Sequence, residues 1–428
     1  MPGVTDLIMS IVAIVAFVII GVGLAGMILF TRAKLVSTAP VKLRINDDDL
    51  LTREVAAGNT LLGSLLEEHI PVPSPCGGKA TCKQCKVQVL EGGGEPLETE
   101  KSTFSKKQIK EGWRLSCQCK VKEEMKLLIP HEYLGVQELI GTVVSNDNVA
   151  TFIKELIVEV SEPIEYRSGA YMQFHVPPFK TDTSSWKQTM EEQYFKDWET
   201  FQMFDKEVDF TQLPPGTMRA YSMASYPAEG KKLMFNIRIA SPPFLNKAPN
   251  PKIPWGICSA YTFALKPGDK VTLSGPYGES YMINDDRELI FLIGGAGSSF
   301  GRSHIKHLFD TEKTRRKLTM WYGARSLKEN IYQEEYEELD RKHDNFSYNL
   351  VLSEPTEEDI EQGWPKDDPE KTAFLFKAFE KGQLGKLEDP EECLYYVCGP
   401  PLHNASVMKL LDDYGVPKEN IILDDFGS

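Results

Sequence analysis

The sequence predicts a multidomain protein made of an N-terminal transmembrane helix, a small α+β domain, an antiparallel β-barrel and a doubly wound α/β domain. Three observations predict this order. An apolar segment without charges begins the chain, five of the eight cysteines fall between residues 76 and 119, and the hydrophobic pattern changes near residue 286 from short strands to strands alternating with helices. A chain of 428 residues is also longer than one hydrophobic core usually supports.

These patterns divide the chain into four predicted segments. We assign 1–35 to the anchor, 36–132 to the α+β domain, 133–285 to the barrel and 286–428 to the α/β domain. The stretch 177–216 interrupts the barrel pattern with many charges and aromatic side chains. Because disordered segments contain few aromatic residues, we expect a folded insertion or a docking flap there.

The charge and the cysteine content exclude two classes of protein. A formal net charge of −14 argues against nucleic-acid binding, which needs a clustered basic face, and it requires any membrane attachment to be hydrophobic. Eight cysteines are too few for a disulfide scaffold in a chain of this length. Their clustering indicates metal ligation in a reducing compartment.

The predicted anchor rests on residues 7–31, which carry no formal charge. A helix of this length crosses a hydrocarbon core of roughly 30 Å. A cleaved signal peptide is the first alternative, but residues 1–6 contain no Lys or Arg. A buried helix of a soluble protein is the second, and the uniform hydrophobicity of the segment argues against it. Positive charges follow at Arg32 and Lys34, so we expect the C-terminal bulk to be cytoplasmic.

The α+β domain and the barrel are predicted from short periodic segments. Alternating residues at 41–46, 86–94 and 125–130 indicate strands, and 60–69 has helical spacing. From 136 to about 285 short β runs follow one another, separated by turn residues, as expected for an antiparallel barrel.

The last domain shows apolar runs of the kind that central parallel strands have. They lie at 288–294, 317–324, 346–353 and 393–399, and helical stretches separate them. Strands alternating with helices predict a doubly wound sheet, whose ligands bind at the carboxyl ends of the strands.

The cysteine spacing predicts a 2Fe–2S cluster. Cys76, Cys82 and Cys85 share one short loop, and Cys117 follows after 31 intervening residues. Three thiolates in one loop and a distant fourth suit two irons that each need two sulfurs. The alternative is a structural zinc site, which usually shows two C-x2-C pairs. Cys119 remains open as the fourth ligand because it lies close to Cys117.

The segment Arg219-Ala220-Tyr221-Ser222 resembles the RxYS motif of the ferredoxin–NADP reductase superfamily. The resemblance implies that Arg219 holds the pyrophosphate of FAD, that Tyr221 stacks on the isoalloxazine, and that Ser222 hydrogen-bonds near its reactive nitrogen. Gly256 and Ser259 resemble the second phosphate element of that superfamily, where Ser259 would cap a helix.

A glycine-rich turn predicts the dinucleotide site. Gly294, Gly295 and Gly297 follow an apolar strand directly and precede a helix, so that phosphates can approach backbone N–H groups. Phe300 stands where the superfamily usually has a proline. Further candidate residues follow the later strands: Tyr322, Arg325, Glu354, Cys398, Gly399 and Pro400.

We make more detailed predictions for Glu354, Cys398 and Phe426. A carboxylate at Glu354 would repel a ribose 2′-phosphate, so NADH is favoured over NADPH. By the resemblance, Cys398 lies beside the nicotinamide and flavin rings, although a plain buried thiol is the alternative. Also by the resemblance, Phe426 covers the flavin face.

The whole chain resembles the family of F subunits of sodium-translocating NADH:quinone oxidoreductases. The order of a ferredoxin-type (β-grasp) domain, an FAD domain and an NAD domain carries the resemblance, together with the anchor, the 177–216 insertion and the ending LDDFG. It implies an NADH dehydrogenase in the inner membrane of a bacterium. Ser222 and Cys398 would position hydride transfer from NADH to FAD.

The same resemblance implies partners. Single electrons would leave through the 2Fe–2S cluster to other membrane subunits, which reduce ubiquinone and pump sodium. Two alternatives stay open: the reductase component of an oxygenase, and a non-catalytic electron carrier.

Overall fold

The computed structural model describes residues 9, 13–27, 39–134, 136–214 and 216–425. Residues 13–27 are helical, and apolar side chains such as Phe17 and Val22 are exposed there. Within the described residues, no helix is long and apolar enough to cross a membrane. The rest of the predicted span, apart from Met9, lies outside the described residues. The chain forms two compact units: 1–72 with 85–134, and 73–84 with 135–428.

The first unit is an α+β domain, as predicted. Its five-stranded sheet has the order β2-β1-β5-β3-β4, with β1 and β5 parallel and the other pairs antiparallel. Thr60 begins α2 by accepting the N–H of Gly63 at 3.0 Å. The strands are β1 (Pro40–Ile45), β2 (Asp48–Ala56), β3 (Lys86–Glu91), β4 (Trp113–Leu115) and β5 (Met125–Leu128), and the helices are α2 (Leu61–Glu67), α3 (Glu98–Lys101), α4 (Lys106–Lys110) and α5 (His131–Leu134).

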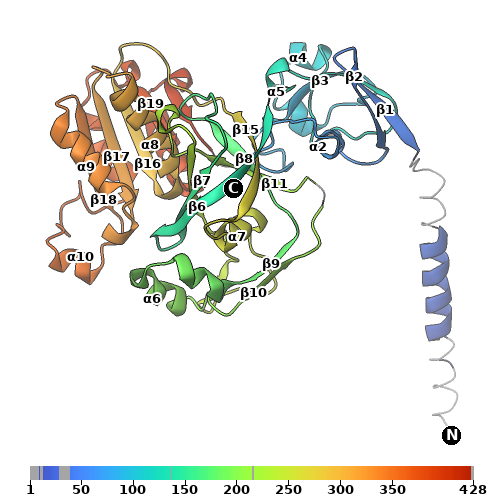
Figure 1. Ribbon diagram of the computed structural model, residues 1–428, viewed down its shortest axis with the longest axis horizontal. Coiled ribbons are helices and arrows are strands. Elements are labelled where there is room, and N and C mark those ends of the chain that lie inside the picture. Colours follow the sequence, from blue (N-terminus) through green and yellow to red (C-terminus); the bar gives the residue numbers. More distant parts are fainter. Residues whose placement is uncertain (1–8, 10–12, 28–38, 135, 215, 426–428) are drawn as a thin grey trace, which may run out of the picture. The chain divides into compact units, whose positions relative to one another are not determined.

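The second unit begins with the predicted antiparallel barrel (Figure 1). Its sheet has the order β11-β8-β15-β6-β7-β12, and a bridge between Met223 and Phe235 joins the two edges. Helix α7 (Ile257–Ala264) contributes buried residues to the barrel core. The strands are β6 (Gln137–Ala150), β7 (Ile153–Glu159), β8 (Tyr171–His175), β11 (Met218–Ser222), β12 (Lys232–Arg238) and β15 (Lys270–Tyr277), and a small hairpin pairs β13 (Phe244–Leu245) with β14 (Ala248–Pro249).

The stretch 177–216 is folded against this barrel. It contains β9 (Phe179–Asp182), η1 (Thr183–Thr189), α6 (Glu192–Thr200) and β10 (Glu207–Phe210). Its buried Trp186 and Trp198 meet edge to face with ring centroids 5.9 Å apart, and Trp186 also packs on Phe263 of α7 at 5.5 Å. These aromatic side chains therefore extend the barrel core, which explains why so polar a stretch is ordered.

The α/β domain completes the second unit. Its parallel sheet has the order β18-β17-β16-β19-β20, and the residues of β16 alternate between two apolar cores, one on each face. The strands are β16 (Leu289–Gly294), β17 (Leu318–Ala324), β18 (Phe346–Leu352), β19 (Leu394–Cys398) and β20 (Ile421–Leu423); the helices are α8 (Ser298–Lys306), which continues into the π-helical η4 (His307–Thr311), α9 (Gln333–Lys342), α10 (Glu357–Glu361), α11 (Leu375–Gly382) and α12 (Pro401–Asp413). Besides η1, the short 3₁₀ helices described in this unit are η2 (Pro227–Glu229), η3 (Gly295–Gly297), η5 (Leu327–Glu329), η6 (Leu384–Lys386), η7 (Pro390–Glu392) and η8 (Lys418–Asn420).

Candidate functional site

The cysteine loop curls tightly within the second unit. The residues Gly77, Gly78, Ala80 and Lys83 all have positive φ, which turns the chain back on itself between Cys76 and Cys85. The two Sγ atoms lie 3.2 Å apart, and the thiol of Cys82 donates to Cys76. This hydrogen bond lowers the pKa of Cys76 and raises that of Cys82. The loop thus holds one thiol pair ready to bind a metal.

A second thiol pair lies in the first unit. A hydrogen bond with Cys117, together with burial, raises the pKa of Cys85 well above that of an ordinary thiol. Cys119 is fully buried and points elsewhere, with its Sγ 3.6 Å from the carbonyl oxygen of Gly93. Cys117, the predicted fourth ligand, is therefore the cysteine beside Cys85, and Cys119 is not.

The donor set suits a 2Fe–2S cluster. Across the described ranges, no group of three or more Cys, His, Asp or Glu side chains is gathered closely enough to hold a metal ion. The cysteines instead form two pairs, and two thiolates are what each iron of such a cluster takes from the protein. In the sequence, only two residues separate Cys82 from Cys85.

The flavin motif lies on the edge strand β11. Ser222 is buried, and its hydroxyl donates to Oδ2 of Asp424 at 2.7 Å. Tyr221 is half-buried against Phe174, with ring centroids 5.5 Å apart, and burial raises its pKa. The guanidinium of Arg219 lies directly over Gly77, where an added Cβ would come within 1.9 Å of Nη1. Within the second unit, the cysteine loop therefore packs against the strand that carries the flavin motif.

The second phosphate element differs from the prediction at one residue. Gly256, not Ser259, is the N-cap of α7, and the helix has no side-chain cap. Ser259 lies at the third helical position, so its hydroxyl donates to the carbonyl oxygen of Gly256 and accepts the N–H of Ala240, both at 3.1 Å. The predicted capping role is wrong. The first N–H groups of α7 nevertheless have no partner within the helix, as an anionic group requires.

The glycine-rich turn joins β16 to α8, as predicted. Gly295 has φ of +55°, and an added Cβ on Gly297 would lie 2.3 Å from the carbonyl oxygen of Cys398. Gly294 is extended and passes close to Pro400. Glycine is needed at 297 because the turn packs directly on the end of β19, and it is favoured at 295 by the positive φ. Phe300, in place of the usual proline, is a fully buried core residue.

The ends of β17 and β18 carry the next candidates. Tyr322 is fully buried, and its hydroxyl accepts a hydrogen bond from the hydroxyl of Ser298 at 3.2 Å. This bond links β17 to the first residue of α8, directly after the glycine-rich turn. The side chain of Arg325 is half-exposed and lies 3.4 Å from Glu329. Glu354 is exposed, and its N–H donates to the carbonyl oxygen of Arg325 at 2.9 Å. Arg325 and Glu354 therefore lie together at the carboxyl edge of the sheet.

Cys398 ends β19 and is fully buried. Its Sγ lies 4.0 Å from Oδ2 of Asp424, and burial raises its pKa well above the ordinary value. Gly399 follows in close contact with the ring of His403, and Pro400 is the N-cap of α12. Both predicted catalytic residues, Ser222 and Cys398, thus converge on one carboxylate. Phe426 lies outside the described residues.

Asp424 is the residue that sequence reasoning missed. It follows β20, and its N–H donates to the carbonyl oxygen of Val397 at 3.0 Å. Burial raises its pKa to about 6, the Ser222 hydroxyl opposes that shift, and the neighbouring Asp425 adds to it. Its place two residues before the predicted C-terminal aromatic, Phe426, was the signal in the sequence, because 202 positions separate Asp424 from Ser222.

Two family models match the chain: a 2Fe-2S iron-sulfur cluster binding domain over residues 45–122 and an oxidoreductase NAD-binding domain over residues 291–407. The chain is 62% identical to a protein of Chlamydia caviae that is named as the F subunit of Na(+)-translocating NADH-quinone reductase, with 97% of each chain covered. It is 45% identical to a protein of the same name from Pseudomonas aeruginosa, over 97% of this chain and 98% of that protein.

Among solved structures, the fold is similar to two reductases. One is described as the ferredoxin reductase in carbazole 1,9a-dioxygenase, with a TM-score of 0.57 and 20% identity, covering 90% of this chain and 98% of that chain. The other is a cytochrome P450 reductase from Amycolatopsis, with a TM-score of 0.58, 18% identity and the same coverage. At such identities the likeness concerns the fold alone.

Proposed function

Because this chain belongs to the family of F subunits of Na(+)-translocating NADH-quinone reductase, we propose that it is the electron-input component of such a complex. It oxidises NADH by hydride transfer to FAD and passes electrons on through a 2Fe–2S cluster. FAD, when bound, accepts electrons in a pair and releases them singly, as a one-electron cluster requires. Family membership favours this role over an oxygenase reductase or a non-catalytic carrier.

One observation carries the proposal: the hydroxyl of Ser222 and the thiol of Cys398 converge on Asp424. Ser222 ends the flavin motif, and Cys398 ends the strand beside the dinucleotide turn. Hydride transfer needs two rings held face to face, so residues from both motifs must meet at one place. Ser222 and Cys398 position the rings there, and Asp424 fixes the orientation of the serine hydroxyl.

The cofactor-binding residues are part of the same proposal. Arg219, Tyr221, Gly256 and Ser259 hold FAD, with Phe426 over its outer face. The dinucleotide binds at the glycine-rich turn and at residues that follow the later strands. These residues are Gly294, Gly295 and Gly297 of the turn, and Tyr322, Arg325, Glu354, Gly399 and Pro400. The exposed carboxylate of Glu354 selects NADH because a 2′-phosphate there would meet a like charge.

The four cluster ligands are Cys76, Cys82, Cys85 and Cys117. The two thiol pairs support this assignment, and the orientation of Cys119 toward Gly93 supports the choice of Cys117. Packing of Gly77 against Arg219 brings the cysteine loop beside the flavin motif within the second unit, which suits direct electron transfer.

The membrane arrangement is also part of the proposal. Residues 7–31 anchor the chain by a single pass in the inner membrane of a bacterium, with the domains 36–132, 133–285 and 286–428 in the cytoplasm. Other subunits of the complex take the electrons, reduce ubiquinone and move sodium. The uncharged stretch and the positive charges that follow it support this placement.

An anaerobic titration of the purified full-length chain with NADH tests the function. We expect the flavin absorbance to bleach and an EPR signal of a reduced 2Fe–2S cluster to appear. A chain that binds FAD but is not bleached by NADH would be a carrier, not a dehydrogenase. A form without residues 1–35 that fully supports a monooxygenase would favour an oxygenase reductase.

A further inference from the structure

The cysteine loop contacts the barrel at two points within the second unit. The hydroxyl of Tyr171 donates to Oε1 of Gln84 at 2.6 Å. Nη1 of Arg219 lies 1.9 Å from the place that a Cβ on Gly77 would take. Tyr171 belongs to β8, and Arg219 belongs to the neighbouring edge strand β11. These two contacts fix the position of Arg219 relative to the loop.

The glycine at position 77 allows this close approach. Gly77 has φ of +63°, and the guanidinium of Arg219 takes the space that a side chain would need. Gly77 directly follows Cys76, one of the proposed cluster ligands. Because consecutive Cα atoms lie about 3.8 Å apart, Nη1 of Arg219 is no farther than about 7 Å from the Cα of Cys76. The cation therefore lies beside a ligand of the cluster.

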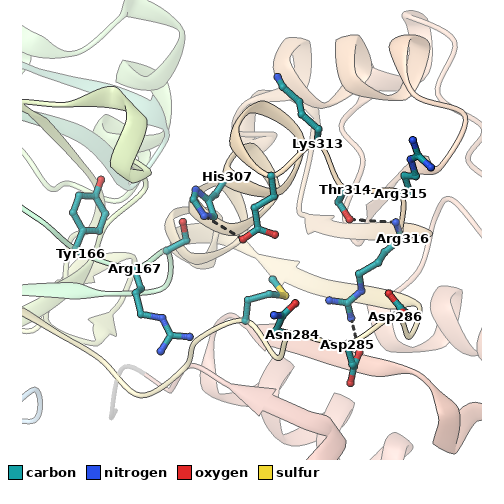
Figure 2. Close-up of a pocket in the computed structure, with 13 residues that line it drawn as sticks. Tyr166, Arg167, Asn284, Asp285, Asp286, His307, Lys313, Thr314, Arg315 and Arg316 are labelled. Carbon is teal, nitrogen blue, oxygen red and sulfur yellow. Dashed lines mark hydrogen bonds and ion pairs between the residues drawn. The ribbon is translucent and has the colours of Figure 1, made fainter.

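The charge of Arg219 is not neutralised by the protein. Its guanidinium donates to the carbonyl oxygen of Met218 at 2.6 Å, and among the residues that the structure describes no carboxylate pairs with it. Arg316 shows the contrast, because it pairs with Asp285 at 3.1 Å on the wall of a cavity elsewhere in this unit (Figure 2). An anionic group near Arg219 therefore meets a full positive charge.

Two lysines of the same loop, Lys79 and Lys83, are also cationic. Both are exposed, so water and salt screen their charges. Arg219 is half-buried, and charges that are partly removed from water interact more strongly than charges in bulk solvent. Among these three cations, Arg219 is thus the one expected to have the largest effect on the cluster.

Reduction gives the cluster one electron, and no bond is formed or broken. In the proposed reaction this electron comes from the reduced flavin. The four thiolates already make the cluster anionic, so the added electron is stabilised by a cation nearby. A positive charge beside the loop therefore raises the reduction potential of the cluster and favours transfer of the electron from the flavin.

We propose that Arg219 raises the reduction potential of the 2Fe–2S cluster in addition to holding the pyrophosphate of FAD. This inference rests on the proposed function, because it takes both cofactors as bound by this chain. The two roles of the side chain depend on different properties. The pyrophosphate needs the planar fork of the guanidinium, whereas the cluster needs only its charge.

An EPR-monitored redox titration of the full-length chain, in detergent and stripped of FAD, tests the proposal. Removing FAD excludes any effect of a variant that acts through the flavin. Arg219→Gln removes the charge, and Arg219→Lys keeps the charge but loses the fork. The matched control is Lys252→Gln, which removes one positive charge at an exposed position outside the cysteine loop. FAD binding to each variant is measured separately by fluorescence titration.

We expect Arg219→Gln to lower the midpoint potential by about 60 mV, which is a tenfold change for a one-electron couple. Arg219→Lys and Lys252→Gln should stay close to the native potential, although Arg219→Lys should bind FAD more weakly. Equal potentials for Arg219→Gln and Lys252→Gln would overturn the proposal and leave the proposed function intact. A fall in Arg219→Lys as large as that in Arg219→Gln would overturn it too, because the charge would then not be the cause. A native chain without the EPR signal of a 2Fe–2S cluster would overturn both.

Discussion

The cysteine loop and the proposed hydride-transfer site are built in opposite ways. The loop between Cys76 and Cys85 owes its shape to four residues with positive φ that lie within it, so its geometry is local. The contact between Ser222 and Asp424 joins residues 202 positions apart and exists only because the barrel and the α/β domain pack together. Damage to the loop should therefore remove the cluster alone, whereas damage to the domain packing should impair hydride transfer and leave the cluster intact.

One buried side chain connects the barrel to the α/β domain. Arg302 of α8 pairs with Glu229 at 2.8 Å and with Glu335 at 3.0 Å, and it donates to the carbonyl oxygen of Ala224 at 3.0 Å. Only 7% of its side chain is exposed. Glu229 and Ala224 belong to the barrel and Glu335 to α9, so this cation holds together the two parts that form the proposed hydride-transfer site.

The largest effect is expected from Cys117→Ser. We expect the EPR signal of the cluster to vanish, because one iron loses a thiolate, while NADH still bleaches the flavin. Cys119→Ser is the matched control and should keep the signal. Loss of the signal in Cys119→Ser, with Cys117→Ser unaffected, would exchange the two assignments.

Replacing Arg302 tests the role of the packing between the barrel and the α/β domain. Arg302→Met leaves two partly buried carboxylates without their cation, and we expect a loss of about 3 kcal/mol in the free energy of unfolding of the second unit. Flavin reduction should slow, and the cluster signal should persist. Lys381→Met, at an exposed position, serves as control in thermal unfolding. Equal unfolding midpoints for the two variants would contradict the role given to Arg302.

Asp424→Asn should have a smaller effect that depends on pH. Burial raises the pKa of Asp424 from 3.8 to about 6, so the folded protein favours the protonated form. Protonated Asp424 therefore contributes to the free energy of unfolding of the native chain. This contribution is complete below pH 3.8 and is lost as the pH rises through about 6. The variant should therefore be more stable than the native chain at pH 8, and not at pH 4.

The same variant should also lose any inflection near pH 6 in the rate of flavin reduction. Ser222→Ala is the comparison, because it removes the hydroxyl but keeps the carboxylate. An inflection that is unchanged in Asp424→Asn would assign it to another group.

The smallest effect is expected for cofactor choice. Glu354→Gln removes a carboxylate at an exposed edge, so the preference for NADH over NADPH should fall by about fivefold, in line with the modest energies of exposed charges. The ratio of kcat/KM for the two nucleotides measures this. An unchanged ratio would show that Glu354 does not face the ribose.

The sequence was most informative where chemistry depends on near neighbours. The doubly wound sheet and the glycine-rich turn are confirmed, because each follows from hydrophobic period or from residues adjacent along the chain. The cap role of Ser259 was wrong because helix α7 begins at Ile257, and an offset of two or three residues decides which side chain reaches the free N–H groups. Asp424 was missed because its partners come from distant strands.

The direction of electron flow is the central claim, and rapid mixing tests it most directly. Oxidised full-length chain is mixed with NADH under anaerobic conditions, and flavin absorbance and the cluster EPR signal are followed in time. We predict that the flavin bleaches first and that the cluster signal rises afterwards. A cluster signal that precedes flavin bleaching, or that appears in a chain stripped of FAD, would contradict the account.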